Sequence, residues 1–308
     1  MDDLHRSQRW AILGSVLCVS FSVLAFEIGL TRAFAALLQY HYAFLIVSGS
    51  VCGLGIGGLL VHFMTRGALP HPSRAGWAAL GFALLTPSTI ALLFGAPALL
   101  SSTLLAAFAP LAPFAFAGAY LAEAFRQRAG DSGRLYQADL LGAGLAAVAV
   151  IPLIGRAGAL NLAFVLGGTA ALGAAYWAFH SGGRALLISS AISALLLPAL
   201  WPLSARTDFL DVRPPAGASP AIAKLLVTPD SRAAGTATVL DSEWSAYART
   251  DLVRSDSPTD GYYTLGTYTD GDTPSIMLPF WGDLAQASQT HWLADIALAM
   301  YPHGSMLS

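Results

Sequence analysis

The sequence predicts a mainly α fold: a polytopic membrane helix bundle of about seven spans, followed by a small antiparallel β-rich C-terminal domain with one helix. Hydrophobic residues make up 55% of the chain and charged residues 11%, against roughly one quarter charged in soluble domains. Mean hydropathy is +0.60. The charge pattern divides the chain into a bundle over 1–205, a linker over 206–235 and a β-rich domain over 236–308, since ten arginines face six acids before about residue 205 and six basic residues face twelve acids after it.

Seven apolar runs account for the bundle. Each is close to the roughly 20 residues that cross the hydrocarbon core. They lie at residues 10–30, 42–64, 77–94, 98–122, 136–152, 159–179 and 185–203. Pro87, Pro110 and Pro113 interrupt the third and fourth runs, where we expect them to kink the helices. The first run is too long for a signal peptide and lacks a small-residue cleavage site, so we expect it to be retained.

Arginine placement predicts the orientation, because positively charged short loops stay in the cytoplasm. The N-terminal side of the seven runs holds Arg6, Arg9, Arg66, Arg74, Arg126, Arg128, Arg134 and Arg184. The opposite side holds only Arg32 and Arg156 before the tail. The chain is therefore expected to be a multi-pass cell-membrane protein with its N-terminus in the cytoplasm and its C-terminal domain on the extracytoplasmic face.

Small residues in two of the runs predict close helix packing. Gly49, Gly53 and Gly57 recur every four residues in the second run, and the fifth run is rich in glycine and alanine over 142–147. The second run also spells a G-x-G-x-x-G pattern from residue 53 to residue 58. That motif needs a preceding strand, which an apolar span does not provide, so we reject a dinucleotide site there.

Glu27, Arg32 and Asp139 are the ionisable residues that point to an intramembrane polar site. A charge at the bilayer centre costs at least about 2.5–3.5 kcal/mol, so it is usually paired or functional. Glu27 lies deepest, and we expect it to face a polar group from another span, with Asp139, Arg32 and His41 as candidates. An interfacial role is the alternative for Arg32 and Asp139, which lie near predicted membrane boundaries.

Several classes of function find no support in the sequence. No run of basic residues indicates nucleic acid as a partner. The predicted partners are the lipid bilayer and a small polyamine or cation. Cys18 and Cys52 both fall inside apolar runs, which argues against a disulfide framework. No pair of the seven histidines has metal-ligand spacing, so no metal site is expected.

The tail has a different pattern, with short alternating runs separated by turn signals. The runs at 236–240, 247–254, 262–269 and 275–280 predict strands, and 290–300 predicts a helix. An Asp-Gly pair at Asp270 and Gly271 suits the positive φ angles of a tight hairpin turn. A domain of this size has a thin core.

Four segments together resemble one known family. They are EIGLTR at 27–32, YQADLLGAGLAA at 136–147, SEWSAYARTDLV at 242–253 and YTDGD at 268–272. The combination is similar to the integral-membrane branch of the spermidine synthase-like family, whose multi-span members carry an aminopropyltransferase-type C-terminal part. The resemblance implies transfer of an aminopropyl group from decarboxylated S-adenosylmethionine to a polyamine. It carries over as possible substrate-facing residues only Tyr247, Asp270 and Gly271, for which a strand aromatic and a turn are the simpler interpretations.

The chain also departs from that family. The given sequence ends about where the family's first nucleotide-binding strand would begin, and no glycine-rich loop or catalytic aspartate is assigned. Thr290, His291 and Trp292 do not reproduce the family's Tyr-His-Glu helix, and Ala248 follows Tyr247 where the soluble enzymes have glutamine. We therefore expect no cofactor site in this chain and no aminopropyltransferase activity from it alone.

Two functions stay open on the sequence. One is an aminopropyltransferase-like membrane protein, whose chemistry needs a carboxylate to take the proton from the attacking amine and a site that positions the donor. The other is a non-enzymatic transport or sensing protein with a polar site around Glu27, Arg32 and Asp139. An extracytoplasmic tail favours the second function, because the donor is made in the cytoplasm.

Overall fold

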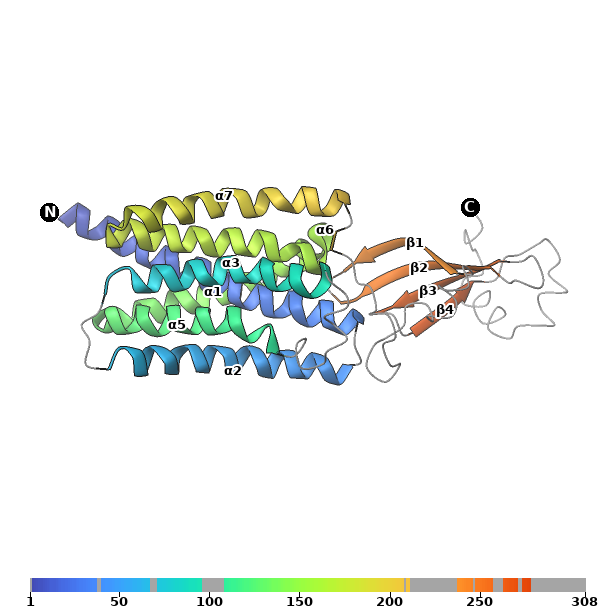
Figure 1. The fold of residues 1–308 in the computed structure, drawn as a ribbon, viewed down its shortest axis with the longest axis horizontal. Coiled ribbons are helices and arrows are strands. Elements are labelled where there is room, and N and C mark those ends of the chain that lie inside the picture. Colours follow the sequence, from blue (N-terminus) through green and yellow to red (C-terminus); the bar gives the residue numbers. More distant parts are fainter. Residues whose placement is uncertain are drawn as a thin grey trace.

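The computed structural model describes residues 2–37, 40–66, 71–95, 108–207, 209–210, 237–245, 247–256, 263–270 and 273–277. The described part is a bundle of long helices with a small sheet at one end (Figure 1). The helices are α1 (Asp2–Leu37), α2 (Tyr40–Met64), α3 (Arg74–Gly95), α5 (Leu111–Gln127), the short 3-10 helix η2 (Ala129–Asp131), α6 (Ser132–Ser181) and α7 (Arg184–Thr207). Among them, 5 helices are long and apolar enough to cross a membrane.

Helix α6 is a hairpin of two helical arms. Its 50 residues are interrupted at Gly158, whose φ of 74° and ψ of 156° are not helical. Both arms lie against the same part of α1: a Cβ on Gly142 would be 2.5 Å from the Leu17 oxygen, and one on Gly173 would be 3.0 Å from the Ser15 oxygen. The sequence predicts these arms as two separate runs, and glycine allows the bend because it tolerates positive φ.

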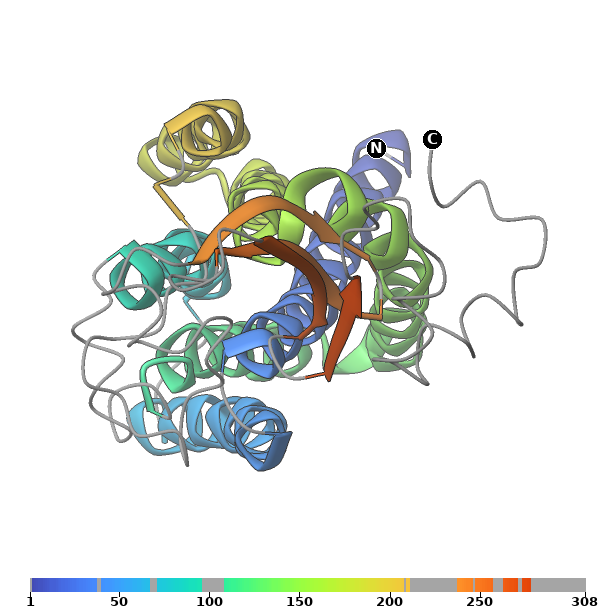
Figure 2. The same ribbon diagram turned by 90° about the vertical axis from the view of Figure 1, so that its right-hand side faces the viewer.

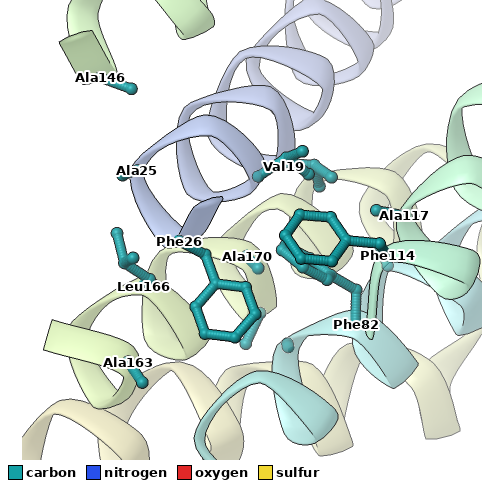
Figure 3. Packing of buried hydrophobic residues seen from close by; sticks show 14 of the residues in the cluster. Val19, Ala25, Phe26, Phe82, Phe114, Ala117, Ala146, Ala163, Leu166 and Ala170 are labelled. Carbon is teal, nitrogen blue, oxygen red and sulfur yellow. The ribbon is translucent and has the colours of Figure 1, made fainter. Parts of the chain in front are cut away.

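Helix α1 is the centre of the bundle, packed along both arms of α6. Its buried face contains Val19, Ala25 and Phe26 (Figure 3). Phe26 stacks on Phe114 of α5 with ring centroids 5.5 Å apart. Small residues from the second arm of α6, including Ala170, complete this layer. Helix α1 is therefore held by aromatic packing against α5 and by close backbone approach to α6.

Helices α2 and α5 approach each other through glycines on both sides. A Cβ on Gly53 would be 2.8 Å from the Phe114 Cβ, and one on Gly57 would be 2.7 Å from the Ala119 nitrogen. From the other side, a Cβ on Gly118 would overlap the backbone of Leu54. Close packing at the predicted glycine stripe is thus confirmed for Gly53 and Gly57.

Two prolines of the fourth run lie at the start of a helix. Helix α5 starts at Leu111 with Pro110 as its N-cap, and Pro113 lies in its first turn, where no backbone N–H is needed. Residues 98–107 of the predicted run lie outside the described residues. Pro87, by contrast, lies inside α3 and is buried there.

A four-stranded antiparallel sheet lies at the bundle end that faces the viewer in Figure 2. Its order is β1 (Ala237–Trp244), β2 (Arg249–Asp256), β3 (Tyr263–Thr269) and β4 (Thr273–Met277), each paired with the next. An irregularity between Val239 and Asp241 shifts the β1–β2 register. All four predicted strands are present with shifted ends, while the predicted helix at 290–300 lies outside the described residues.

Candidate functional site

Asp139 lies half-buried on α6, against α1. Its Oδ1 accepts a hydrogen bond of 2.5 Å from the Ser20 hydroxyl of α1. Ser20 is at the middle of the apolar run 10–30, whereas the sequence places Asp139 near the start of its run. The difference arises because α6 begins at Ser132, four residues before the predicted run, so Asp139 is already two helical turns into the helix.

Glu27 is half-buried on α1, about two helical turns beyond Ser20. Its backbone carbonyl accepts a hydrogen bond from the Thr31 hydroxyl at 2.8 Å. Within the part of the chain that the structure describes, its carboxylate makes no hydrogen bond or ion pair. Asp139 and Arg32 are therefore not its partners, and the side chain of the third candidate, His41, lies outside the described residues.

Arg32 joins the bundle to the sheet. Its Nη1 donates a hydrogen bond of 2.8 Å to the backbone oxygen of Tyr247, 215 positions away in the chain. The Tyr247 ring is 80% exposed, so this residue contributes its carbonyl and not its ring. The structure thus separates the three predicted intramembrane residues: Arg32 contacts the sheet, Asp139 contacts α1, and Glu27 has neither as a partner.

Trp244 provides the second contact between sheet and bundle. Its indole lies over the bend of α6, where a Cβ on Gly158 would be 3.3 Å from the ring, and its backbone oxygen lies near Gly155. The guanidinium of Arg249 also lies over the Trp244 ring, with its Cζ 5.6 Å from the centroid. Gly158 therefore has two roles in this contact: it allows the positive φ of the bend, and its lack of a side chain leaves space for the indole of Trp244.

A buried ion pair stabilises β1 and β2 next to this contact. Arg249 Nε donates to Asp251 Oδ1 at 2.8 Å, and both side chains are almost fully buried. Ser242 donates to the same oxygen and accepts a bond of 3.1 Å from Arg249 Nη2. Within the described residues, Asp251 Oδ2 is buried without a hydrogen-bond partner. This network fixes the guanidinium that holds Trp244.

Asp270 has a structural role at the end of β3. Its Oδ1 accepts a bond of 2.9 Å from the Arg249 amide, and its own amide donates to the Arg249 oxygen at 2.8 Å. Its φ of 48° is positive, as expected for a turn aspartate. Its partner in the predicted turn, Gly271, lies outside the described residues.

A further polar pair in the bundle was not predicted from the sequence. The hydroxyls of Ser15 and Tyr120 are 2.8 Å apart and buried. The Tyr120 ring packs edge-on against Trp177, whose indole nitrogen donates to the Pro72 oxygen at 2.8 Å. Ser15 and Tyr120 are 105 residues apart, so only the tertiary fold brings them together.

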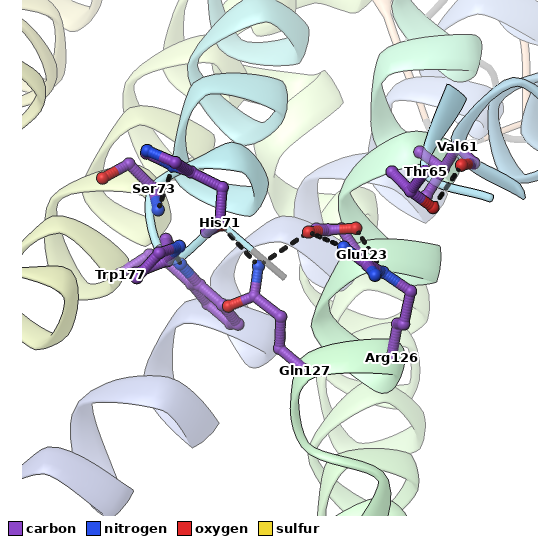
Figure 4. Close-up of polar contacts among 9 residues, drawn as sticks. Val61, Thr65, His71, Ser73, Glu123, Arg126, Gln127 and Trp177 are labelled. Carbon is purple, nitrogen blue, oxygen red and sulfur yellow. Dashed lines mark hydrogen bonds and ion pairs between the residues drawn. The ribbon is translucent and has the colours of Figure 1, made fainter. Parts of the chain in front are cut away.

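At the opposite end from the sheet, Glu123 is the centre of a hydrogen-bonded cluster (Figure 4). Arg126 binds its carboxylate with two bonds of 2.9 and 2.8 Å, and Gln127 adds one of 2.9 Å. Gln127 also donates to the His71 oxygen. Burial raises the pKa of Glu123, but these bonds and the charges of Arg126 and Arg74 outweigh burial, so its pKa lies below the ordinary value.

The described residues contain no group of three or more His, Cys, Asp or Glu side chains that could hold a metal ion. The arrangement has a half-buried carboxylate, Asp139, against α1, and a sheet that contacts the bundle through Arg32 and Trp244. Comparison with known proteins found no matching family model, no similar curated protein and no similar solved structure.

Proposed function

We propose that the chain is a membrane protein with seven crossings, formed by α1, α2, α3, α5, the two arms of α6, and α7. Five apolar helices of sufficient length support this count. The α6 hairpin adds a sixth crossing, because its arms pack side by side on α1. Helix α5 belongs to the seventh crossing, the predicted run at 98–122, and its last residues from Glu123 to Gln127 extend beyond the end of that run.

The orientation we propose has the arginine-rich end in the cytoplasm. Contacts of Gln127 with His71, of Trp177 with Pro72 and of Arg128 with His180 gather the loops that carry most arginines at one end of the bundle. The sheet is at the other end (Figure 1) and would face the extracytoplasmic side. Reporter fusions after Ser308 and after Gly182 test this: we expect activity in the cytoplasm only for the fusion after Gly182, and the opposite result would overturn it.

The function that we propose is that of an aminopropyltransferase-like membrane protein, in which the bundle anchors the β domain that contributes to amine binding. One observation carries this proposal. Two separate segments of the family resemblance meet, because Arg32 of the first donates a hydrogen bond to the backbone oxygen of Tyr247 in the third. Contacts between distant motifs are expected where the motifs serve one shared site.

Amine binding by the whole chain tests this proposal. Putrescine and spermidine should raise the midpoint of thermal unfolding of the purified protein, because a ligand that binds only the folded state stabilises it. Magnesium chloride controls for charge screening. No shift with either amine would overturn the proposal. A transfer assay with decarboxylated S-adenosylmethionine and putrescine should show no turnover by this chain alone, and turnover would contradict that expectation.

A transport or sensing protein is the second candidate, and Asp139 favours it. Its carboxylate is half-buried against α1, and its only partner among the described residues is the Ser20 hydroxyl. An acid in a membrane bundle without a basic partner is typical of a proton or cation path. The test is uptake of putrescine and of protons into liposomes, with Asp139→Asn compared to Asp131→Asn, an acid paired with Arg134 outside the bundle core. Loss of flux only in Asp139→Asn supports this candidate; equal flux in both variants refutes it.

A further inference from the structure

A pocket of about 160 Å³ lies at the arginine-rich end of the bundle, between the start of α1 and the start of α6. Three arginines line it: Arg9, Arg128 and Arg134. The one acid in its lining is Asp131. Its lining thus carries more positive than negative charge, which attracts an anion.

The three guanidinium groups differ in the hydrogen bonds and ion pairs that they already make within the protein. Arg128 donates to a ring nitrogen of His180 at 2.5 Å, a bond that uses a neutral acceptor and leaves its charge uncompensated by a carboxylate. Arg134 contacts Asp131 at a long 3.4 Å, with both side chains partly exposed. Arg9 is exposed and also lines the pocket. Fork-shaped guanidinium groups of this kind bind phosphate oxygens in pairs.

The backbone adds an independent preference for an anion. Helix α6 begins at the pocket, and its N-cap residue Asp131 makes no side-chain capping hydrogen bond. A Cβ on Gly133 would meet no atom within 4 Å, so the first turn is open. The N–H groups and the positive end of a long helix bind phosphate in many proteins.

The remaining lining of the pocket is apolar. Ile12 and Leu135 are buried, and Leu13 is half-buried. On the same kind of measure a single water needs only about 10–15 Å³, so the pocket has room for a phosphate group and the atoms attached to it. A lining of both arginine and apolar side chains fits a phosphate that carries a nonpolar substituent, as a phospholipid headgroup does.

The geometry points to a phosphate-binding site formed by Arg9, Arg128, Arg134 and the N-terminus of α6. This site lies at the end of the bundle away from the sheet, and it does not depend on the function proposed above. Phospholipid phosphate and free inorganic phosphate share the chemistry that it recognises.

Binding measurements on the purified full chain test this inference and separate the two sources. Native mass spectrometry with dioctanoyl phosphatidylglycerol measures lipid binding, and titration calorimetry with inorganic phosphate measures free phosphate binding. The double variant Arg9→Gln/Arg134→Gln removes two guanidinium groups. Loss of each group should weaken binding by about 10- to 100-fold. Arg128 is left unchanged because it also bonds His180.

The control variant is Arg66→Gln/Arg184→Gln, which removes the same charge from exposed arginines that do not line the pocket. We expect the control to keep wild-type affinity, and Arg9→Lys/Arg134→Lys to bind more tightly than the glutamine variant. Binding of lipid alone identifies a headgroup site, and binding of both ligands identifies a general phosphate site. If neither ligand binds the wild type, or if the control loses as much affinity as the pocket variant, the inference is wrong.

Discussion

Replacement of Gly57 by alanine should separate α2 from α5. A Cβ at this position would be 2.7 Å from the Ala119 nitrogen and would overlap the Ala115 oxygen. Both neighbours are backbone atoms of a helix, so neither can move aside as a side chain would. Overpacking of this kind costs about 1–3 kcal/mol, and we expect the upper half of that range.

Gly55→Ala in the same helix provides the control, because a Cβ at Gly55 would meet no atom within 4 Å. Alanine favours a helix over glycine by up to about 1 kcal/mol, and this gain is common to both variants. The difference in unfolding free energy between Gly57→Ala and Gly55→Ala therefore reports the clash alone.

Unfolding in detergent, followed by intrinsic fluorescence as SDS is added, measures this difference. We expect Gly55→Ala to be as stable as the wild type or slightly more stable, and Gly57→Ala to unfold at a lower SDS fraction than both. Equal stability of the two variants would refute the close packing of α2 on α5 and, with it, the interpretation of the glycine stripe.

Three other changes test the remaining contacts. Trp244→Ala should release the sheet from the α6 bend and speed protease cleavage between residues 207 and 237, whereas Tyr247→Ala should not, because the exposed ring is dispensable and the carbonyl that accepts from Arg32 is kept. Glu123→Gln should lower the free energy of unfolding by about 1–3 kcal/mol through loss of charge-assisted bonds. The pKa of Glu123 is depressed in the folded protein. Its contribution to the free energy of unfolding is therefore complete above the unfolded pKa of 4.5 and disappears as the pH falls through the folded pKa. The stability of the wild type should then decline in acid more steeply than that of Glu123→Gln. Arg249→Met should destabilise the sheet by about 3–5 kcal/mol, measured by hydrogen exchange of β1 and β2, because it leaves the Asp251 charge buried without its partner; unchanged exchange would contradict the role of the ion pair.

The elements were predictable from the sequence because apolar length and turn residues are local signals. The four strands and the glycine stripe at Gly53 and Gly57 follow from such signals. The seven-run count stays a prediction, although the bend at Gly158 explains how two runs can share one long helix. The ends of the elements were less accurate, as with β1, which continues to Trp244 beyond the predicted end at residue 240.

The contacts between elements were not predictable in the same way. Arg32 bonds a backbone carbonyl, and a carbonyl leaves no trace in the residue type of Tyr247. The Ser15–Tyr120 bond joins residues with no unusual local pattern. Glu123 could have been found, since Arg126 and Gln127 follow at the i+3 and i+4 spacing of a helix face, but it falls one residue outside the predicted span.

The two ends of the bundle constrain which function can operate. The sheet is docked at the arginine-poor end through Arg32 and Trp244, and the proposed phosphate site lies at the arginine-rich end. If the arginine-rich end faces the cytoplasm, the sheet is kept from a donor made there, and Asp139 is then the group through which the bundle could act on a cation. If the fusion data place the sheet in the cytoplasm, the docked β domain has access to the donor and the aminopropyltransferase-like function gains support. The side on which Trp244 lies therefore decides between the two proposals more directly than any measurement on Asp139.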